Sequence, residues 1–157
     1  MPDPCVRPSD DRESLDEDRQ RHQECLKVLD ELEACVDRRP DLETAWIKSL
    51  QSSFATFAAA LRLHFEGEER GTMYRDLPET KPRLAGRIDE LRAEHDRLLV
   101  DLDVAVQQVA DLSGGRVGEA AKVRDSIRDL IATLRLHEAN EARLLQSAYW
   151  REVGTGD

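Results

Sequence analysis

The chain lacks an apolar run long enough to cross a bilayer, and its first thirteen residues lack the apolar centre of a secretion signal. We therefore expect a cytoplasmic protein with no membrane partner. The chain also lacks any stretch in which apolar and polar residues alternate, which is the pattern of a half-buried strand. Strands are not expected.

Basic residues are too few to suggest a nucleic-acid partner. Lys and Arg total 23 against 33 Asp and Glu, so the formal net charge is -10. No basic stripe is present that could neutralise phosphates, and we expect no nucleic-acid partner.

Cysteine is scarce as well, with three in the chain. Cys25 and Cys35 would lie roughly 15 Å apart along one helix, which is too far for a disulfide. We expect free thiols in a reducing compartment.

A helical period in the apolar residues runs along almost the whole chain and predicts four helices. Short connections between them favour an all-α, up-down-up-down four-helix bundle. Pro40 and Asp41 are expected to separate the first two helices, and residues 113–115 the last two. In the longer middle connection, Thr80 can cap the third helix and Pro82 fits its first turn. The apolar stripes lie in residues 15–36, 46–64, 84–109 and 117–144.

The length of 157 residues suits one domain. Residues 1–13 are charged, contain prolines and show no period, so we expect a flexible acidic tail there. The single domain is expected to cover residues 14–152, with a flexible C-terminus at 153–157.

The tetrapeptide Leu-Arg-Leu-His occurs twice, and the two copies belong to a weak repeat with an offset of 73 residues. This offset maps all four histidines of the chain onto one another in pairs. Each half has one His and, 42 residues later, a His-x-x-x-Glu motif, whose two side chains share a helix face. Two such hairpins would bring together His22, His64, Glu68, His95, His137 and Glu141.

These six residues can be interpreted in two ways. Each His could be a hydrogen-bonded core residue and each Glu a solvated helix residue. Burying all six together without a strong partner is costly, however, and a metal would compensate that cost. Four imidazoles and two carboxylates can serve two ions, each taking two nitrogens and sharing both carboxylates, which leaves positions open on an octahedral ion. Iron fits this donor set best, with manganese or zinc as lesser options.

Two other metal motifs can be set aside. Ferritin-like bundles use Glu-x-x-His, but the residues three before the histidines are Arg19, Leu61, Arg92 and Leu134. A zincin needs His-Glu-x-x-His, and the chain has Glu141 at the last position of that motif.

The pattern resembles the hemerythrin-like (HHE cation-binding) domain over about residues 14–150. The motifs that carry the resemblance are His22, then His64-Phe-Glu-Gly-Glu68, then Glu94-His95, then His137-Glu-Ala-Asn-Glu141. It implies a non-haem di-iron centre in which His22 and His64 hold one iron and His95 and His137 the other. By the same resemblance, Glu68 and Glu141 bridge the two irons.

The chain departs from the oxygen-carrying members of that family at two positions. Those members have a His four residues before the third-helix histidine and an Asp five residues after the last one. Here the corresponding residues are Leu91 and Ala142. The departures disfavour reversible oxygen carriage and favour sensing, iron handling or redox reaction.

Three functions remain open. The first is a di-iron module that binds or senses oxygen, nitric oxide, peroxide or iron, and passes the signal to a separate protein. The second is a di-iron enzyme that reduces peroxide or nitric oxide, and the third is a metal-free helical interaction protein. Binding or sensing is favoured over catalysis.

Several residues near the proposed ligands also have expected roles. Cys25, one turn after His22, is interpreted as a small buried residue, with a redox-responsive role as the alternative. Glu69 and Glu94 could accept hydrogen bonds from imidazole N–H groups or could be surface charges. Tyr74, Tyr149 and Trp150 are assigned to packing at the end of the bundle.

Overall fold

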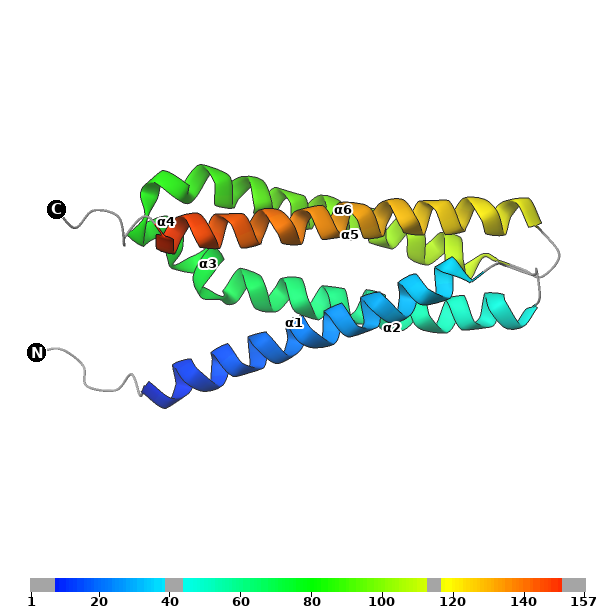
Figure 1. Ribbon diagram of the computed structural model, residues 1–157, viewed down its shortest axis with the longest axis horizontal. Coiled ribbons are helices and arrows are strands. Elements are labelled where there is room, and N and C mark those ends of the chain that lie inside the picture. Colours follow the sequence, from blue (N-terminus) through cyan, green and yellow to red (C-terminus); the bar gives the residue numbers. More distant parts are fainter. Residues whose placement is uncertain (1–7, 39–43, 113–116, 151–157) are drawn as a thin grey trace, which may run out of the picture.

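The computed structural model describes residues 8–38, 44–112 and 117–150, and its four long helices form a bundle. They are α1 (Pro8–Asp37), α2 (Thr44–Arg70), α5 (Ala85–Ala110) and α6 (Val117–Trp150). Successive long helices run in opposite directions, with α1 and α2 below α5 and α6 in Figure 1. No strand occurs in the described ranges. The predicted all-α, up-down-up-down bundle is confirmed.

Three short elements occupy the connection between α2 and α5. They are α3 (Thr72–Arg75), α4 (Leu77–Thr80) and the 3₁₀ turn η1 (Pro82–Leu84). They cover the end of the bundle at which α2 finishes and α5 begins (Figure 1).

Two buried clusters make up the core. The larger one is formed by all four long helices and contains Phe54, Phe57 and Phe65. The smaller one lies at the α3–α4 end and contains Tyr74, Leu91 and other buried residues. The buried histidines lie between these clusters, because Phe65 of the larger cluster stacks on His95, at 4.1 Å between ring centroids, and Tyr74 of the smaller cluster contacts the same ring.

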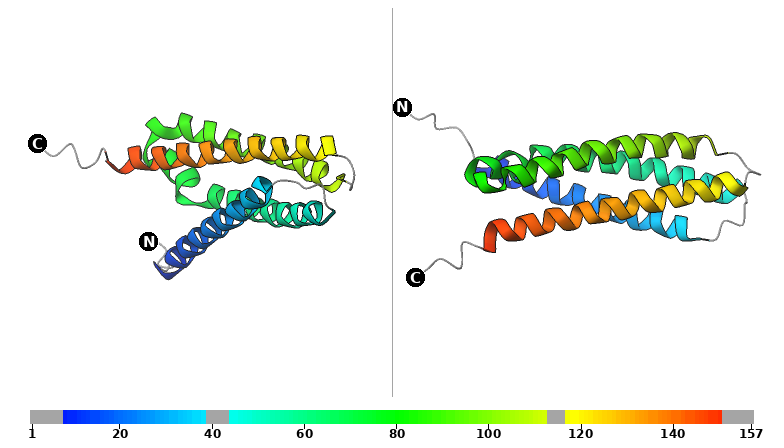
Figure 2. Two further views of the ribbon diagram at one scale, coloured as in Figure 1. Left: turned by 45° about the vertical axis from the view of Figure 1, so that its right-hand side comes forward. Right: turned by 90° about the horizontal axis from the view of Figure 1, so that it is seen from above.

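The N-terminal part of α1 diverges from the other helices (Figures 1 and 2). α1 packs chiefly on α2, whereas α5 packs chiefly on α6. Among the α1 residues whose burial is described, 16, 17, 19, 20 and 21 are exposed, His22 is partly buried and Cys25 is buried. His22 thus lies where the described part of α1 passes from exposed to buried positions.

The start of the first helix differs from the one expected. α1 begins at Pro8, inside the segment expected to be a tail. Proline suits the first turn of a helix, and Asp10 and Asp11 follow it where negative charge favours the helix dipole. Residues 1–7 and 153–157 lie outside the described residues, as do the expected connections at Pro40 and Asp41 and at 113–115.

The expected N-cap at Thr80 is wrong. Thr80 is the last residue of α4, and Lys81 precedes η1. The Thr80 hydroxyl donates to the carbonyl oxygen of Asp76, at 3.1 Å, one turn earlier in the chain. The reason is that a short helix begins at Leu77, with Pro78 in its first turn, and ends at Thr80.

None of the helices in the described ranges combines the length and the apolar character needed to cross a membrane.

Phe57 provides a test of the larger core cluster, since its side chain is fully buried. We expect Phe57→Ala to lower the free energy of unfolding by about 3–5 kcal/mol, because it leaves a cavity in a packed core. Urea denaturation followed by circular dichroism measures this. Ala59→Ser, at an exposed position of the same helix, should change it by less than about 0.5 kcal/mol. Equal effects of the two substitutions would contradict the packing described.

Candidate metal centre

The structure places the six predicted ligands together in the bundle interior. Their potential ligand atoms form two adjoining groups, within each of which all the atoms lie within 4.8 Å of one another. The first group is His22, His64, Glu68 and Glu138, and the second is Glu68, His95, His137 and Glu141.

The first group joins α1, α2 and α6. His64 Nε2 lies 3.0 Å from Glu68 Oε1 and 3.0 Å from Glu138 Oε1. His22 Nδ1 lies 3.5 Å from His64 Nε2 and 3.7 Å from Glu138 Oε2. The His22 side chain is 40% exposed, whereas His64 is buried. This group is therefore the one closer to solvent.

The second group joins α2, α5 and α6 and is more deeply buried. His137 Nε2 lies 3.0 Å from Glu141 Oε1, and His95 Nε2 lies 3.4 Å from the same oxygen. His95 is fully buried, and His137 and Glu141 are nearly so. Solvent has little access to these three side chains.

Glu68 belongs to both groups. Its Oε1 faces His64, and its Oε2 lies 3.2 Å from His95 Nε2. One carboxylate thus presents one oxygen to each histidine pair, which is the arrangement of a bridging ligand. Glu141 belongs to the second group alone, and Glu138 to the first alone.

Glu138 was not predicted as a site residue. Its position directly after His137 matches the second residue of the zincin motif, but the chain does not complete that motif. On a helix, residues three apart lie on the same side about one turn apart, so Glu138 is a neighbour of Glu141. With His137 and Glu141 directed at the second group, Glu138 is directed at the first. The Glu-x-x-Glu spacing was the signal in the sequence that could have indicated it.

The assignment of Tyr74 to packing alone is wrong. Its ring is buried in the smaller core cluster, but its hydroxyl donates a hydrogen bond to Glu141 Oε1 and lies 3.2 Å from His95 Nε2. Burial, together with Glu141, raises the pKa of the Tyr74 hydroxyl, so the hydroxyl keeps its proton. The side chains of Tyr149 and Trp150 are not among those described.

The outer nitrogens of two imidazoles contact carboxylates. His137 Nδ1 lies 2.8 Å from Glu94 Oε2, and His95 Nδ1 lies 3.2 Å from Glu69 Oε1. These contacts turn both Nε2 atoms toward the centre, as metal-binding histidines require. Of the two interpretations considered for Glu69 and Glu94, the structure favours that of hydrogen-bond acceptors.

Protonated imidazoles partly compensate the carboxylate charge in the metal-free centre. Burial by itself lowers the pKa of His64, but Glu138 and Glu68 outweigh it and raise this pKa to about 10. Burial opposes Glu141 and Glu68 in the same way at His95, whose pKa rises to about 9. The pKa of Glu141 is lowered, because the neighbouring imidazoles of His137 and His95 outweigh its burial.

A scan against family models decides the family. The hemerythrin HHE cation-binding domain matches residues 14–149, which is most of the chain. The chain belongs to the hemerythrin HHE cation-binding family. No curated protein and no solved structure gives a significant match.

The residues present fit the cation that the HHE family implies. Glu68 Oε2 lies 3.2 Å from His95 Nε2 and His137 Nε2 lies 3.0 Å from Glu141 Oε1, but both atoms are buried and neither forms a well-aligned hydrogen bond within the described part of the chain. Both are directed at the second group, where a cation would satisfy a carboxylate oxygen and an imidazole nitrogen together. The residues of this centre therefore agree with the metal binding that the HHE family implies.

Cys25 lies near the centre as a buried, free thiol. Burial, and after it the negative charges of Glu138 and Glu68, raise its pKa to about 12. The thiol is thus protonated at neutral pH, as expected for a small buried residue rather than for a reactive one.

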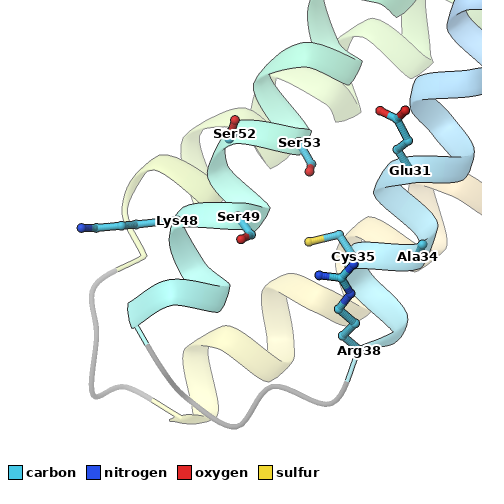
Figure 3. Close-up of a pocket in the computed structure, with 8 residues that line it drawn as sticks. All are labelled: Glu31, Ala34, Cys35, Arg38, Lys48, Ser49, Ser52 and Ser53. Carbon is cyan, nitrogen blue, oxygen red and sulfur yellow. The ribbon is translucent and has the colours of Figure 1, made fainter.

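A cavity of about 410 Å³ opens onto the first group, and a larger one lies elsewhere on the α1–α2 pair. The larger cavity, of about 580 Å³, is lined by Cys35, Ser49, Ser53 and other residues (Figure 3). It contains no histidine and neither of the two candidate ligand groups. The smaller cavity is the one relevant to the metal centre.

Metal uptake should release protons. At pH 7 His64 and His95 carry protons, because their pKa values are raised to about 10 and about 9. A metal must displace these protons, so the apparent affinity for Zn²⁺ should rise as the pH is raised from 7 to 9. Titration of the metal-free protein with Zn²⁺ in weak buffer, with a pH indicator, measures the release. Affinity independent of pH would contradict the protonation described.

Cys25 should resist alkylation in the folded protein. With its pKa raised to about 12, the thiolate is scarce at pH 8, and burial blocks the reagent. We expect iodoacetamide to modify Cys25 at least about 100-fold more slowly in the native protein than in urea. Peptide mass spectrometry resolves Cys25 from the other cysteines. Similar rates in the two conditions would show that the thiol is accessible.

Proposed function

We propose that this HHE protein holds two irons in a carboxylate-bridged centre and there binds or senses a small ligand, which is oxygen, nitric oxide or peroxide. The observation that carries the proposal is the position of Glu68, which presents one oxygen to each of two histidine pairs. A single carboxylate shared in this way suits two ions held side by side.

The ligand assignment follows the two groups. His22, His64 and Glu138 would hold the first iron. His95, His137 and Glu141 would hold the second, with Glu68 between the two irons. The family resemblance gave Glu141 a bridging role, but its contacts with His95 and His137 support a role at the second iron.

Iron is preferred because it suits the donor atoms of the site and because of the reactions it would supply. Imidazole nitrogens and carboxylate oxygens suit iron, and manganese and zinc are the lesser options. With two imidazoles and two carboxylates, each octahedral ion keeps about two positions for an exogenous ligand. Bound iron would supply reversible electron transfer at those positions.

Residues around the centre prepare it for such a ligand. Glu69 and Glu94 orient His95 and His137, and the Tyr74 hydroxyl holds a proton beside Glu141. Phe65 covers one face of His95 and excludes water from it. A metal-free interaction protein would need none of these contacts.

Iron content of variants tests the assignment. We expect about two irons per chain after reconstitution of the wild type, measured by inductively coupled plasma mass spectrometry. Glu68→Ala should lose both, because both ions lose a ligand. Glu138→Ala should lose the first iron and keep the second.

The matched control is Glu66→Ala. Glu66 is exposed on α2, two residues before Glu68, and pairs with Arg70. Its substitution should leave the iron content unchanged. Full iron retention by Glu68→Ala would overturn the bridging role, and a wild type that takes up no iron would overturn the di-iron proposal. Multiple turnovers of peroxide or nitric oxide would favour an enzyme over a sensor.

A further inference from the structure

The cavity beside the first group is larger than a diatomic ligand needs. Its volume is about 410 Å³, whereas one water molecule occupies about 30 Å³ in the liquid. Sites for small organic ligands range from about 300 to 1,000 Å³. The cavity thus has the size of an organic ligand site, and its lining comes from α1, α2, the connection after α2, and α6.

Its wall divides into an apolar part and a polar part. Gly71 and Met73 from the connection after α2, and Ala142 and Leu145 from α6, form the apolar part. The polar part is the metal centre itself, including His22. A molecule in the cavity would therefore place an apolar tail on α3 and α6 and a polar head at the first iron.

The apolar part of the wall selects an uncharged tail. Away from the metal centre, the described lining contains no Lys, Arg or His. A charged tail would find no oppositely charged side chain beside Met73, Ala142 and Leu145, so its transfer from water would be costly. A ligand with an uncharged tail and a head that carries oxygen donors meets this condition.

We propose that the cavity binds an organic hydroperoxide, with the tail against Met73, Ala142 and Leu145 and the O–O group toward His22 and His64. The proposal rests on the di-iron function, because the two irons supply the electrons. Two bound Fe(II) would supply two electrons as the O–O bond breaks, and two protons from solvent would complete one alcohol and one water. Among the peroxides considered above, an organic one then fits the site better than hydrogen peroxide.

Binding of cumyl alcohol tests the cavity without any reaction. This alcohol is the product of cumene hydroperoxide and cannot oxidise the centre. We expect saturable binding to the purified full chain by isothermal titration calorimetry. Ala142→Phe should weaken it about tenfold or more, because the added ring occupies the tail position.

Two further variants accompany this measurement. Thr72→Trp, at an exposed position of α3 on the cavity wall, should also weaken binding and does not alter α6. Ala132→Phe, at an exposed position of α6 outside the cavity, is the control and should leave binding unchanged. Absence of saturable binding, or equal binding by all variants, would overturn the cavity proposal.

A second readout is oxidation of the diferrous protein, followed by absorbance in a stopped-flow instrument. The rate with cumene hydroperoxide divided by the rate with hydrogen peroxide should fall about tenfold in Ala142→Phe. An unchanged ratio would overturn the role of the apolar wall. Failure of the wild type to take up iron would instead overturn the di-iron function, and alcohol binding would still report on the cavity.

Discussion

Four imidazoles and three carboxylates meet inside this bundle, and the need to compensate their charge governs the surrounding structure. In the metal-free chain the compensation comes from protons: Glu68, Glu138 and Glu141 raise the pKa values of the buried histidines. It is incomplete, because Glu68 Oε2 and His137 Nε2 form no well-aligned hydrogen bond in the described residues. A cation would replace the protons and satisfy both atoms. The same contacts that make the empty centre costly therefore make it a good metal site.

The rest of the fold supports this centre on one side and leaves it accessible on the other. Tyr74 and Phe65 cover His95, and Glu69 and Glu94 orient two of the imidazoles. At the first group the covering is thinner, since His22 is partly exposed and a cavity adjoins it. The two proposed irons would thus be unequal: one enclosed, and one open to a ligand. The repeat in the sequence instead suggests two nearly equivalent ion sites.

The limits of prediction are clearest in α6 and in the connection after α2. The His-x-x-x-Glu spacing placed His137 and Glu141 on one face, which helix geometry alone decides. Glu138 lies beside Glu141 on the same side of α6, but which histidines it contacts depends on where α1 and α2 pack. Tyr74 lies on a four-residue helix, which is too short for a periodic pattern to indicate its direction. The predicted N-cap at Thr80, in the same connection, is wrong for the same reason. Local pattern determines what lies on one helix face, but not which face a distant helix meets.

The sequence by itself determined the four helices, the bundle and the six residues that gather in it, because the period of apolar residues and the spacing of the histidines are properties of single helices. Only the tertiary structure decided that Glu68 serves both histidine pairs while Glu138 and Glu141 serve one each. It also decided that Tyr74 reaches the centre, and that a cavity adjoins His22. These features depend on how far apart helices pack and at what angle, which arises from the contacts of the whole core.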